Sequence, residues 1–160
     1  MRETPLEYTD IVFNAKPDAV PYNYRISYKV TQLCLIMRIC GRGDVCSLIK
    51  LHMISFALIQ ENMRKLVDFA NGIGSAPIVR FDPSVNRALT YAIGYGLIKR
   101  QQNAKYKLTD RGKQLAEQIK VVGDLMVIEI GDLNLLAKKL TERKVEEIVD
   151  RWRIKDAENQ

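Results

Sequence analysis

The sequence contains a single histidine, His52, which lies within a largely apolar stretch of the 160-residue chain. One histidine excludes metal sites built from several histidines and weakens any nucleophile–histidine–acid triad. The chain also lacks a phosphate-binding GxxxxGK loop, a GxGxxG loop and a GxSxG motif. Because its carboxylates are scattered without paired spacing, we expect a protein that is not an enzyme and that uses no metal or other cofactor.

Cysteine is scarce as well, and the three residues Cys34, Cys40 and Cys46 form no CxxC pair. An odd number of unpaired cysteines favours reduced thiols that pack as small apolar side chains, and hence a reducing cytoplasm. The apolar stretch 30–40 is too short to span a bilayer and contains Arg38. The N-terminus has no signal-like pattern. We therefore expect a cytoplasmic protein without a membrane segment.

Positive charge is concentrated in one segment. The chain has a net charge of +6, and residues 80–113 carry all of it, since eight basic residues there face only Asp82 and Asp110. A local excess of this kind predicts a polyanionic partner. The candidate nucleic-acid-binding residues are Arg80, Arg87, Lys99, Arg100, Lys105, Lys107, Arg111 and Lys113.

Helical spacing of apolar residues predicts helices over residues 27–40, 48–60 and 61–71. Asp82-Pro83 is a strong start signal for a further helix that ends near Gly94, because the carboxylate caps the helix and proline fits its first turn. Residues 44–47 and 77–81 are predicted to form short strands.

Residues 97–108 have the pattern of a basic β-hairpin. Two short strands flank the turn 102–104, and Thr109 can cap a helix over residues 111–121. Leu97, Tyr106 and Leu108 are expected to point inward, whereas the alternating residues Lys99, Lys105 and Lys107 point outward. The order helix, basic hairpin, capped helix is typical of a winged helix. The predicted fold is therefore mainly α with a small β-wing, a winged helix-turn-helix with additional C-terminal helices.

The predicted organisation has four parts: an extended N-terminal arm (1–25), a winged-helix domain (26–122), a C-terminal helical extension (123–154) and a mobile tail (155–160). The extension has amphipathic stripes. They form either a partner-binding surface or the rest of the protein's own core. The candidate partner-binding residues are Leu133, Leu136, Leu140, Val145, Ile148 and Trp152.

An exposed basic hairpin beside a helix suits contact with the DNA backbone. An acidic protein partner or a plain solvated face would explain the same charge. The helix before the hairpin offers only Asn86 and Arg87 near its start for reading bases, so sequence-independent binding is favoured.

Four segments of the chain resemble a known family in their order. They are Val20-Pro21, "CSLIKLHMISFAL" (46–58), "VRFDPSVNRALTYAIGYGLI" (79–98) and "KYKLTDRGKQLAEQI" (105–119). They are similar to the small middle components of bacterial three-component anti-phage defence operons built around an SMC-like ABC ATPase, the Lamassu type. The resemblance covers about residues 20–120. It implies a winged-helix adaptor that binds the ATPase and helps couple DNA sensing to an effector nuclease, with the catalytic residues in the partner chains.

Three hypotheses about function follow. The chain is a non-catalytic adaptor subunit of an SMC-like ATPase defence complex, docking on the ATPase and contacting DNA backbone through its basic wing. Alternatively, it is a dimeric winged-helix transcription regulator, or a protein–protein interaction module that does not bind DNA.

Overall fold

The computed structural model describes residues 25–158. The predicted N-terminal arm, apart from Arg25, lies outside the described residues, as do the last two residues of the predicted tail.

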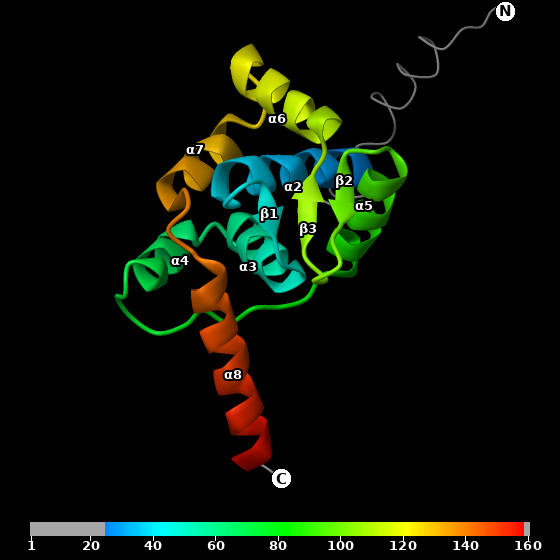
Figure 1. Ribbon diagram of the computed structural model, residues 1–160. Coiled ribbons are helices and arrows are strands. Elements are labelled where there is room, and N and C mark those ends of the chain that lie inside the picture. Colours follow the sequence, from blue (N-terminus) through cyan, green and yellow to red (C-terminus); the bar gives the residue numbers. More distant parts are fainter. Residues whose placement is uncertain (1–24, 159–160) are drawn as a thin grey trace, which may run out of the picture.

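The described chain is mainly helical and contains one small antiparallel sheet of three strands in the order β1-β3-β2 (Figure 1). This confirms the prediction of a mainly helical fold with a small β-element. The elements in chain order are α2 (Ile26–Cys40), β1 (Val45–Cys46), α3 (Leu48–Ile59), α4 (Met63–Ala70), α5 (Pro83–Gly94), β2 (Ile98–Arg100), β3 (Tyr106–Leu108), α6 (Asp110–Val122), α7 (Val127–Leu136) and α8 (Glu142–Glu158).

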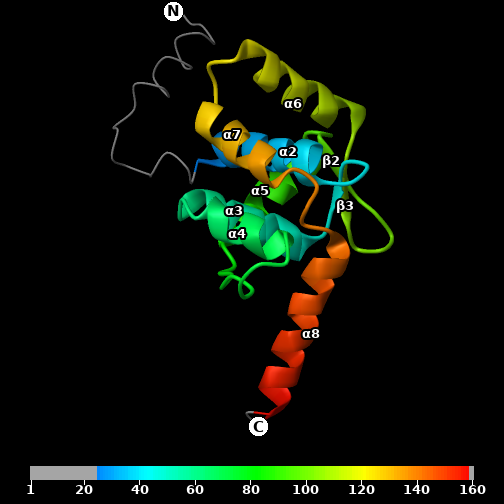
Figure 2. The same cartoon turned by 90° about the vertical axis from the view of Figure 1, so that its left-hand side faces the viewer.

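Helix α2 lies at the centre of the molecule (Figures 1 and 2). It contacts α3, α5, α6 and α7. The five consecutive residues 33–37 are all fully buried, which is possible only when a helix is covered on most of its sides. Each of these helices therefore takes its position from the side of α2 against which it packs.

The predicted helix starts are confirmed by their caps. The side chains of Ser47, Asp82 and Thr109 accept hydrogen bonds from the backbone N–H groups of Lys50, Ser84 and Gly112, respectively. Each cap satisfies a donor that the first turn of a helix leaves unpaired. The Asp82 cap fixes where α5 begins, and the Thr109 cap fixes where the chain leaves the hairpin.

The predicted strand over residues 77–81 is wrong. Residues 75–82 form neither helix nor strand and run along the surface as an irregular link between α4 and α5 (Figure 1). Pro77 lacks the N–H that a sheet ladder requires, and the three-stranded sheet pairs only β1, β2 and β3 among the described residues.

The first helix of the predicted C-terminal extension (123–154) covers only residues 127–136. Helix α7 passes through Gly131 and Asp132 without a break, although glycine weakens a helix interior. It ends at Ala137, whose φ of +47° is incompatible with a continuing right-handed helix.

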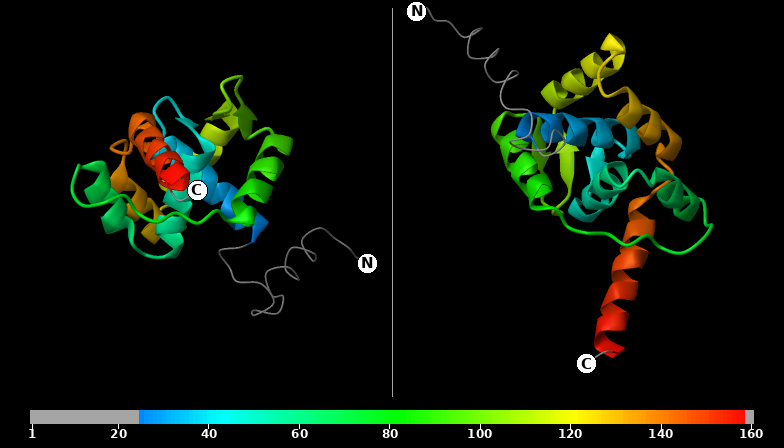
Figure 3. Two further views of the ribbon diagram at one scale, coloured as in Figure 1. Left: turned by 90° about the horizontal axis from the view of Figure 1, so that it is seen from below. Right: turned by 180° about the vertical axis from the view of Figure 1, so that it is seen from behind.

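The helical extension reaches further than residue 154, where it was predicted to end. Helix α8 continues to Glu158, so residues 155–158 of the predicted mobile tail are helical. The half of α8 nearer the C-terminus projects from the body of the molecule (Figure 3).

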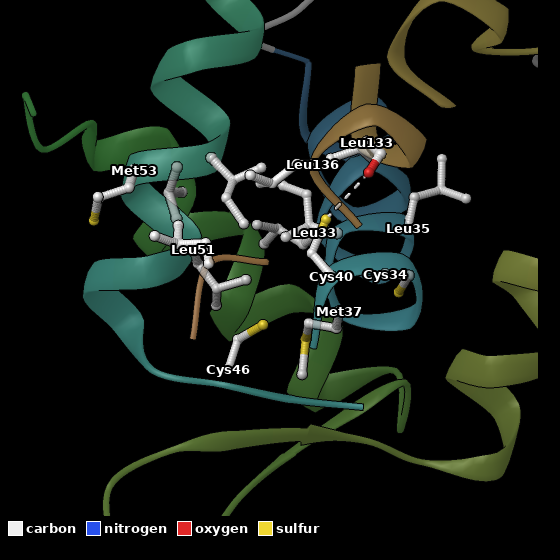
Figure 4. Close-up of a cluster of buried hydrophobic side chains, with 14 of the residues drawn as sticks. Leu33, Cys34, Leu35, Met37, Cys40, Cys46, Leu51, Met53, Leu133 and Leu136 are labelled. Carbon is white, nitrogen blue, oxygen red and sulfur yellow. Dashed lines mark hydrogen bonds between the residues drawn. The ribbon is translucent and has the colours of Figure 1, made fainter. Parts of the chain in front are cut away.

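The C-terminal helices complete the protein's own core, which corrects the predicted partner-binding surface. Five of its six residues are at most 2% exposed and belong to the main hydrophobic cluster. Leu133 and Leu136 of α7 face α2 and α3 (Figure 4). The thiol of Cys40 donates a hydrogen bond to the Leu133 carbonyl, at 3.6 Å. The sixth residue, Trp152, is half-buried against the same cluster. The corrected residues are Leu133, Leu136, Leu140, Val145, Ile148 and Trp152.

Gly112 sets how closely α6 approaches the hairpin. A Cβ at this position would lie 2.1 Å from the carbonyl oxygen of Leu97 and 2.8 Å from the Leu108 side chain. The backbone N–H of Thr109 donates to the same Leu97 carbonyl, at 3.0 Å. The glycine in the sequence "TDRG" is therefore required for contact between the helix and the base of the hairpin.

We expect Gly112→Ala to lower the free energy of unfolding by about 2 kcal/mol or more, because the methyl group meets backbone that cannot move without breaking the Thr109–Leu97 hydrogen bond. Urea denaturation measures this change. Gly131→Ala is the matched control, since nothing lies within 4 Å of a Cβ there, and it should stabilise the protein slightly. Equal effects at the two glycines would contradict this interpretation of the hairpin base.

Candidate nucleic-acid interface

The basic hairpin consists of β2 and β3, paired antiparallel. Ile98 lies opposite Leu108, and both are buried. The sequence pattern therefore predicts the first strand correctly but predicts the wrong inward-pointing residue. Leu97 was expected to point inward, whereas Ile98 is the fully buried residue and Leu97 is only partly buried. Tyr106 is half-buried against the core as predicted, opposite Cys46 of β1.

Two lysines lie directly opposite each other on the outer face of the hairpin. Lys99 of β2 pairs in register with Lys107 of β3. Directly opposed residues of an antiparallel pair have their Cβ atoms about 5 Å apart, and like charges in this position destabilise a sheet. Within residues 25–158 neither lysine forms an ion pair with a carboxylate. The hairpin therefore keeps an unneutralised pair of positive charges that works against its own stability.

Lys105 extends this row of lysines. It is two residues before Lys107, and the alternation of side chains along a strand assigns both to the same face. The turn that precedes Lys105 is tight, since the Asn103 side chain accepts a hydrogen bond from the Lys105 N–H at 3.0 Å. The backbone N–H of Gln101 donates to the Lys105 carbonyl at 2.8 Å. We call Lys99, Lys105 and Lys107 the lysine row.

Arg100 and Arg111 are exposed near opposite ends of the hairpin. Arg100 ends β2 opposite Tyr106. The guanidinium of Arg111 lies beside Gly96 at the base, where a Cβ added to the glycine would be 3.3 Å from it. Because Arg100 directly follows Lys99, alternation assigns its side chain to the other face of the hairpin, the face that carries Tyr106, so Arg100 adds exposed positive charge near the hairpin without extending the lysine row.

The structure separates two of the predicted residues from this surface. Lys113 contacts the carboxylates of Asp44 and Asp110, at 3.7 and 3.8 Å, so acidic neighbours offset its charge. Arg80 lies in the link before α5 and lines a groove with Phe56 and Gln60 of the α3 region. The sequence could not separate these two from the others, because the separation depends on tertiary contacts.

Asp44 belongs to an ionic network that joins three elements. Its carboxylate accepts hydrogen bonds from Arg38 of α2 at 3.1 and 3.2 Å, and Arg38 also donates to Glu117 of α6 at 2.8 Å. This hydrogen bond from Arg38 lowers the pKa of Glu117. The network ties α2 and α6 to the turn before β1, beside the sheet.

Helix α5 lies next to the hairpin (Figures 1 and 3). Its inward face carries Val85, Ala88, Leu89 and Ala92, all buried. The opposite face exposes Asn86, Arg87 and Thr90, whose side chains can donate or accept hydrogen bonds, and the exposed rings of Tyr91 and Tyr95 lie at the edge of the inward face beside α2. The sequence draws attention to Asn86 and Arg87 and misses the tyrosines.

The two tyrosines of α5 form a stacked pair. The ring centroids of Tyr91 and Tyr95 are 6.3 Å apart and the planes are inclined by 29°. Both rings are about half exposed and line an open groove of about 420 Å³ against α2. At 100° per residue Tyr95 lies about 20° from the buried Ala88, so the pair borders the buried face of α5 beside α2. The i, i+4 spacing of two aromatic residues is the sequence signal that could have identified them.

His52 of α3 contacts the residues at the start of α5. Its Nδ1 accepts a hydrogen bond from the backbone N–H of Asp82 at 3.2 Å, and Nε2 lies 3.3 Å from Oδ1 of Asn86. The ring also packs edge-on against Phe81, with centroids 4.8 Å apart. Both contacts are made at once only if the ring is neutral and carries its proton on Nε2. The single histidine is therefore a positioning group for the exposed helix.

A buried polar cluster lies near His52. The ammonium of Lys29 is fully buried and donates to Gln32 Oε1 at 3.2 Å and to Ser55 Oγ at 3.0 Å. Burial lowers the pKa of Lys29, and the charge of Asp82 partly opposes this. Because Gln32 and Ser55 are neutral, this lysine depends on hydrogen bonds for its stability in the interior.

The cysteines have no accessible thiol. All three are free and fully buried, and burial raises the pKa of Cys34, Cys40 and Cys46 to about 12. They are thus protonated at neutral pH and pack as apolar side chains. Among residues 25–158, no group of three or more histidine, cysteine, aspartate or glutamate side chains is arranged to hold a metal ion. In the same range, no helix combines the length and apolar character that crossing a bilayer needs.

The His52 contacts predict a pH-dependent stability. Burial lowers the pKa of His52 below its ordinary value of 6.5, so the unfolded chain binds a proton more readily than the folded chain. The neutral His52 ring therefore contributes to the free energy of unfolding. This stabilisation is fully present above pH 6.5 and is lost as the pH falls below that value through the lowered pKa of the folded state. We expect the free energy of unfolding to decrease between pH 7 and pH 5, measured by urea denaturation at each pH.

His52→Gln is the control for this slope, because glutamine keeps hydrogen-bonding capacity without titrating. His52 is the only histidine of the chain, so most of the slope between pH 7 and pH 5 should disappear in the variant. An unchanged slope would show that His52 is not held in its neutral form.

Comparisons of the chain with protein-family models, with curated proteins and with solved structures found no match.

Proposed function

We propose that the chain is a winged-helix protein that binds the DNA backbone through the lysine row and α5. The order of α2, β1, α3, α5, β2 and β3 supports this fold, because a winged helix has three helices and a three-stranded sheet in this order. The sheet order β1-β3-β2 also agrees with it. Here α4 is an additional short helix, and α6 to α8 follow the wing.

The opposed lysines of the hairpin are the observation that carries the proposal. Lys99 is exposed and Lys107 is half-buried, and like charges directly opposed across two strands lower stability unless a ligand neutralises them. Phosphates spaced along a duplex would do so, and the release of their counterions would favour binding. Lys99 and Lys107, with Lys105 on the same face, provide this contact.

Helix α5 is the element proposed to approach the major groove. Its exposed face offers Arg87, Thr90 and Asn86, which are side chains able to contact phosphates or base edges. Asn86 is also engaged by His52, which leaves few groups free for bidentate base contacts. The proposed binding is therefore mostly independent of DNA sequence.

The resemblance described above adds a biological setting to this proposal. In that setting the chain is a non-catalytic, cytoplasmic adaptor of an SMC-like ABC ATPase, and it helps couple contact with DNA to an effector nuclease. The protonated, inaccessible thiols support a role without cysteine chemistry.

Replacing one lysine of the opposed pair should change stability and DNA binding in opposite directions. Lys99→Glu creates a cross-strand pair of opposite charges with Lys107, which should raise the free energy of unfolding by a few tenths of a kcal/mol, up to about 1 kcal/mol. The same change removes a phosphate contact, so the affinity for a random-sequence duplex should fall roughly tenfold at low salt. Urea denaturation and fluorescence anisotropy measure the two effects.

Arg64→Glu is the charge-matched control. Arg64 is exposed on α4, on the opposite side of the molecule from the hairpin (Figure 1), and the variant has the same net charge as Lys99→Glu. It should retain most of the DNA affinity. An equal loss in both variants would reduce the effect to net charge, and unchanged binding in Lys99→Glu would remove the hairpin from the interface.

A further inference from the structure

Helix α8 begins beside one end of the lysine row. The carboxylate of Glu142, the first residue of α8, accepts a hydrogen bond from the backbone N–H of Ser47 at 3.0 Å. Strand β1 pairs with β3 so that Cys46 lies opposite Tyr106, and the same register continued by one residue puts Ser47 opposite Lys105. The start of α8 is therefore fixed at the edge of the sheet, next to Lys105.

A groove of about 390 Å³ lies between α8 and this end of the sheet. Its charged side chains are Lys105 from the hairpin and Glu142, Glu146, Asp150 and Arg153 from α8. At 100° per residue, the four α8 positions fall within about 80° of one another around the helix axis. Two cations and three carboxylates give the groove a net charge of −1, in a chain whose net charge is +6.

The three carboxylates differ in their partners. Asp150 forms an ion pair with Arg153 at 3.8 Å, and Glu142 keeps its charge while it accepts the Ser47 N–H. Glu146 is exposed and forms no ion pair with any of residues 25–158. Lys105, which is half-buried, also forms none within that range. Two unneutralised carboxylates thus line the same groove as a lysine that is proposed to contact phosphate.

We propose that Glu142 and Glu146 form a negative boundary of the DNA-binding surface, which weakens phosphate contact at Lys105. This inference rests on the proposed binding of DNA. A phosphate that approaches Lys105 also approaches the two carboxylates, and like charges repel. The repulsion is weaker at Lys99, because β3 separates its strand from β1 in the sheet order β1-β3-β2.

The boundary sets the side on which a duplex lies. Phosphate contacts along the lysine row are expected to be strongest at Lys99 and weakest at Lys105, so the duplex is directed toward β2. Helix α5 packs against β2, and α8 projects from the body of the molecule on the β1 side (Figures 1 and 3). The carboxylates of α8 therefore favour the same placement of DNA that α5 needs.

Two pairs of glutamine substitutions with equal net charge test the boundary. Glu142→Gln combined with Glu146→Gln removes both carboxylates, and glutamine can still accept the Ser47 N–H. Glu147→Gln combined with Glu158→Gln is the control, because both residues are exposed on α8 and neither lines the groove. Fluorescence anisotropy measures the affinity of each full-length variant for a random-sequence duplex, and circular dichroism checks that each is folded.

The measurement is made at 0.1 M salt, where charges are screened beyond about 10 Å. We expect the first pair to increase the affinity about fivefold and the control pair to increase it less than about twofold. Glu146→Gln alone, which leaves the contact with Ser47 intact, should increase the affinity about twofold. Equal gains from the two pairs would overturn the proposal, because net charge alone would then explain the effect.

Lys105→Gln shows whether the carboxylates act at this end of the lysine row. In that background the gain from the Glu142 and Glu146 pair should shrink to less than about twofold, because the duplex is no longer held beside α8. An undiminished gain would overturn the proposal.

The same assay separates this inference from the proposed function. Binding that Lys99→Glu weakens and that the Glu142 and Glu146 pair leaves unchanged would support contact through the hairpin and overturn the boundary alone. Absence of DNA binding in the wild type and in every variant would overturn both.

Discussion

The enclosure of α2 is the constraint on which the rest of the structure depends. Residues 33–37 are fully buried, so every neighbouring element must present an apolar face to this helix. Helix α5, which precedes the hairpin in the chain, and helix α6, which follows it, both pack on α2, and α7 covers a further side. The short sheet, which would be marginal alone, is held between helices whose positions α2 fixes.

The same packing buries polar side chains, which would destabilise the fold if they had no hydrogen-bond partners. Lys29 lies in the interior, where its ammonium donates hydrogen bonds to two neutral groups of the described chain, Gln32 and Ser55. His52, on the neighbouring helix, is kept neutral and bonds to the start of α5. Polar groups that stabilise the interior thus also fix the position of the exposed helix, because the same turn of α5 contains Asp82 and Asn86. The residues that stabilise the interior therefore also set the position of the helix proposed to contact DNA.

Local signals in the sequence predicted the elements well. The caps at Ser47, Asp82 and Thr109 and the alternation through the hairpin depend on near neighbours in the chain, and the structure has them. Tertiary contacts decided the features that were missed. The stripes of α7 and α8 are amphipathic whether they bind a partner or the chain's own core, and only packing showed that the residues chosen as partner-binding are interior.

The candidate site was predictable in its charge and not in its arrangement. Composition located the basic segment, but the opposed pair of Lys99 and Lys107 depends on strand register, and the loss of Lys113 to Asp44 depends on the fold. The salt dependence of binding to a random-sequence duplex tests the central claim most directly, by comparing the wild type with a variant whose lysine row is changed to glutamine. If the three lysines contact phosphates, the slope of log K against log salt should become shallower by about 2.7. An unchanged slope would contradict the account.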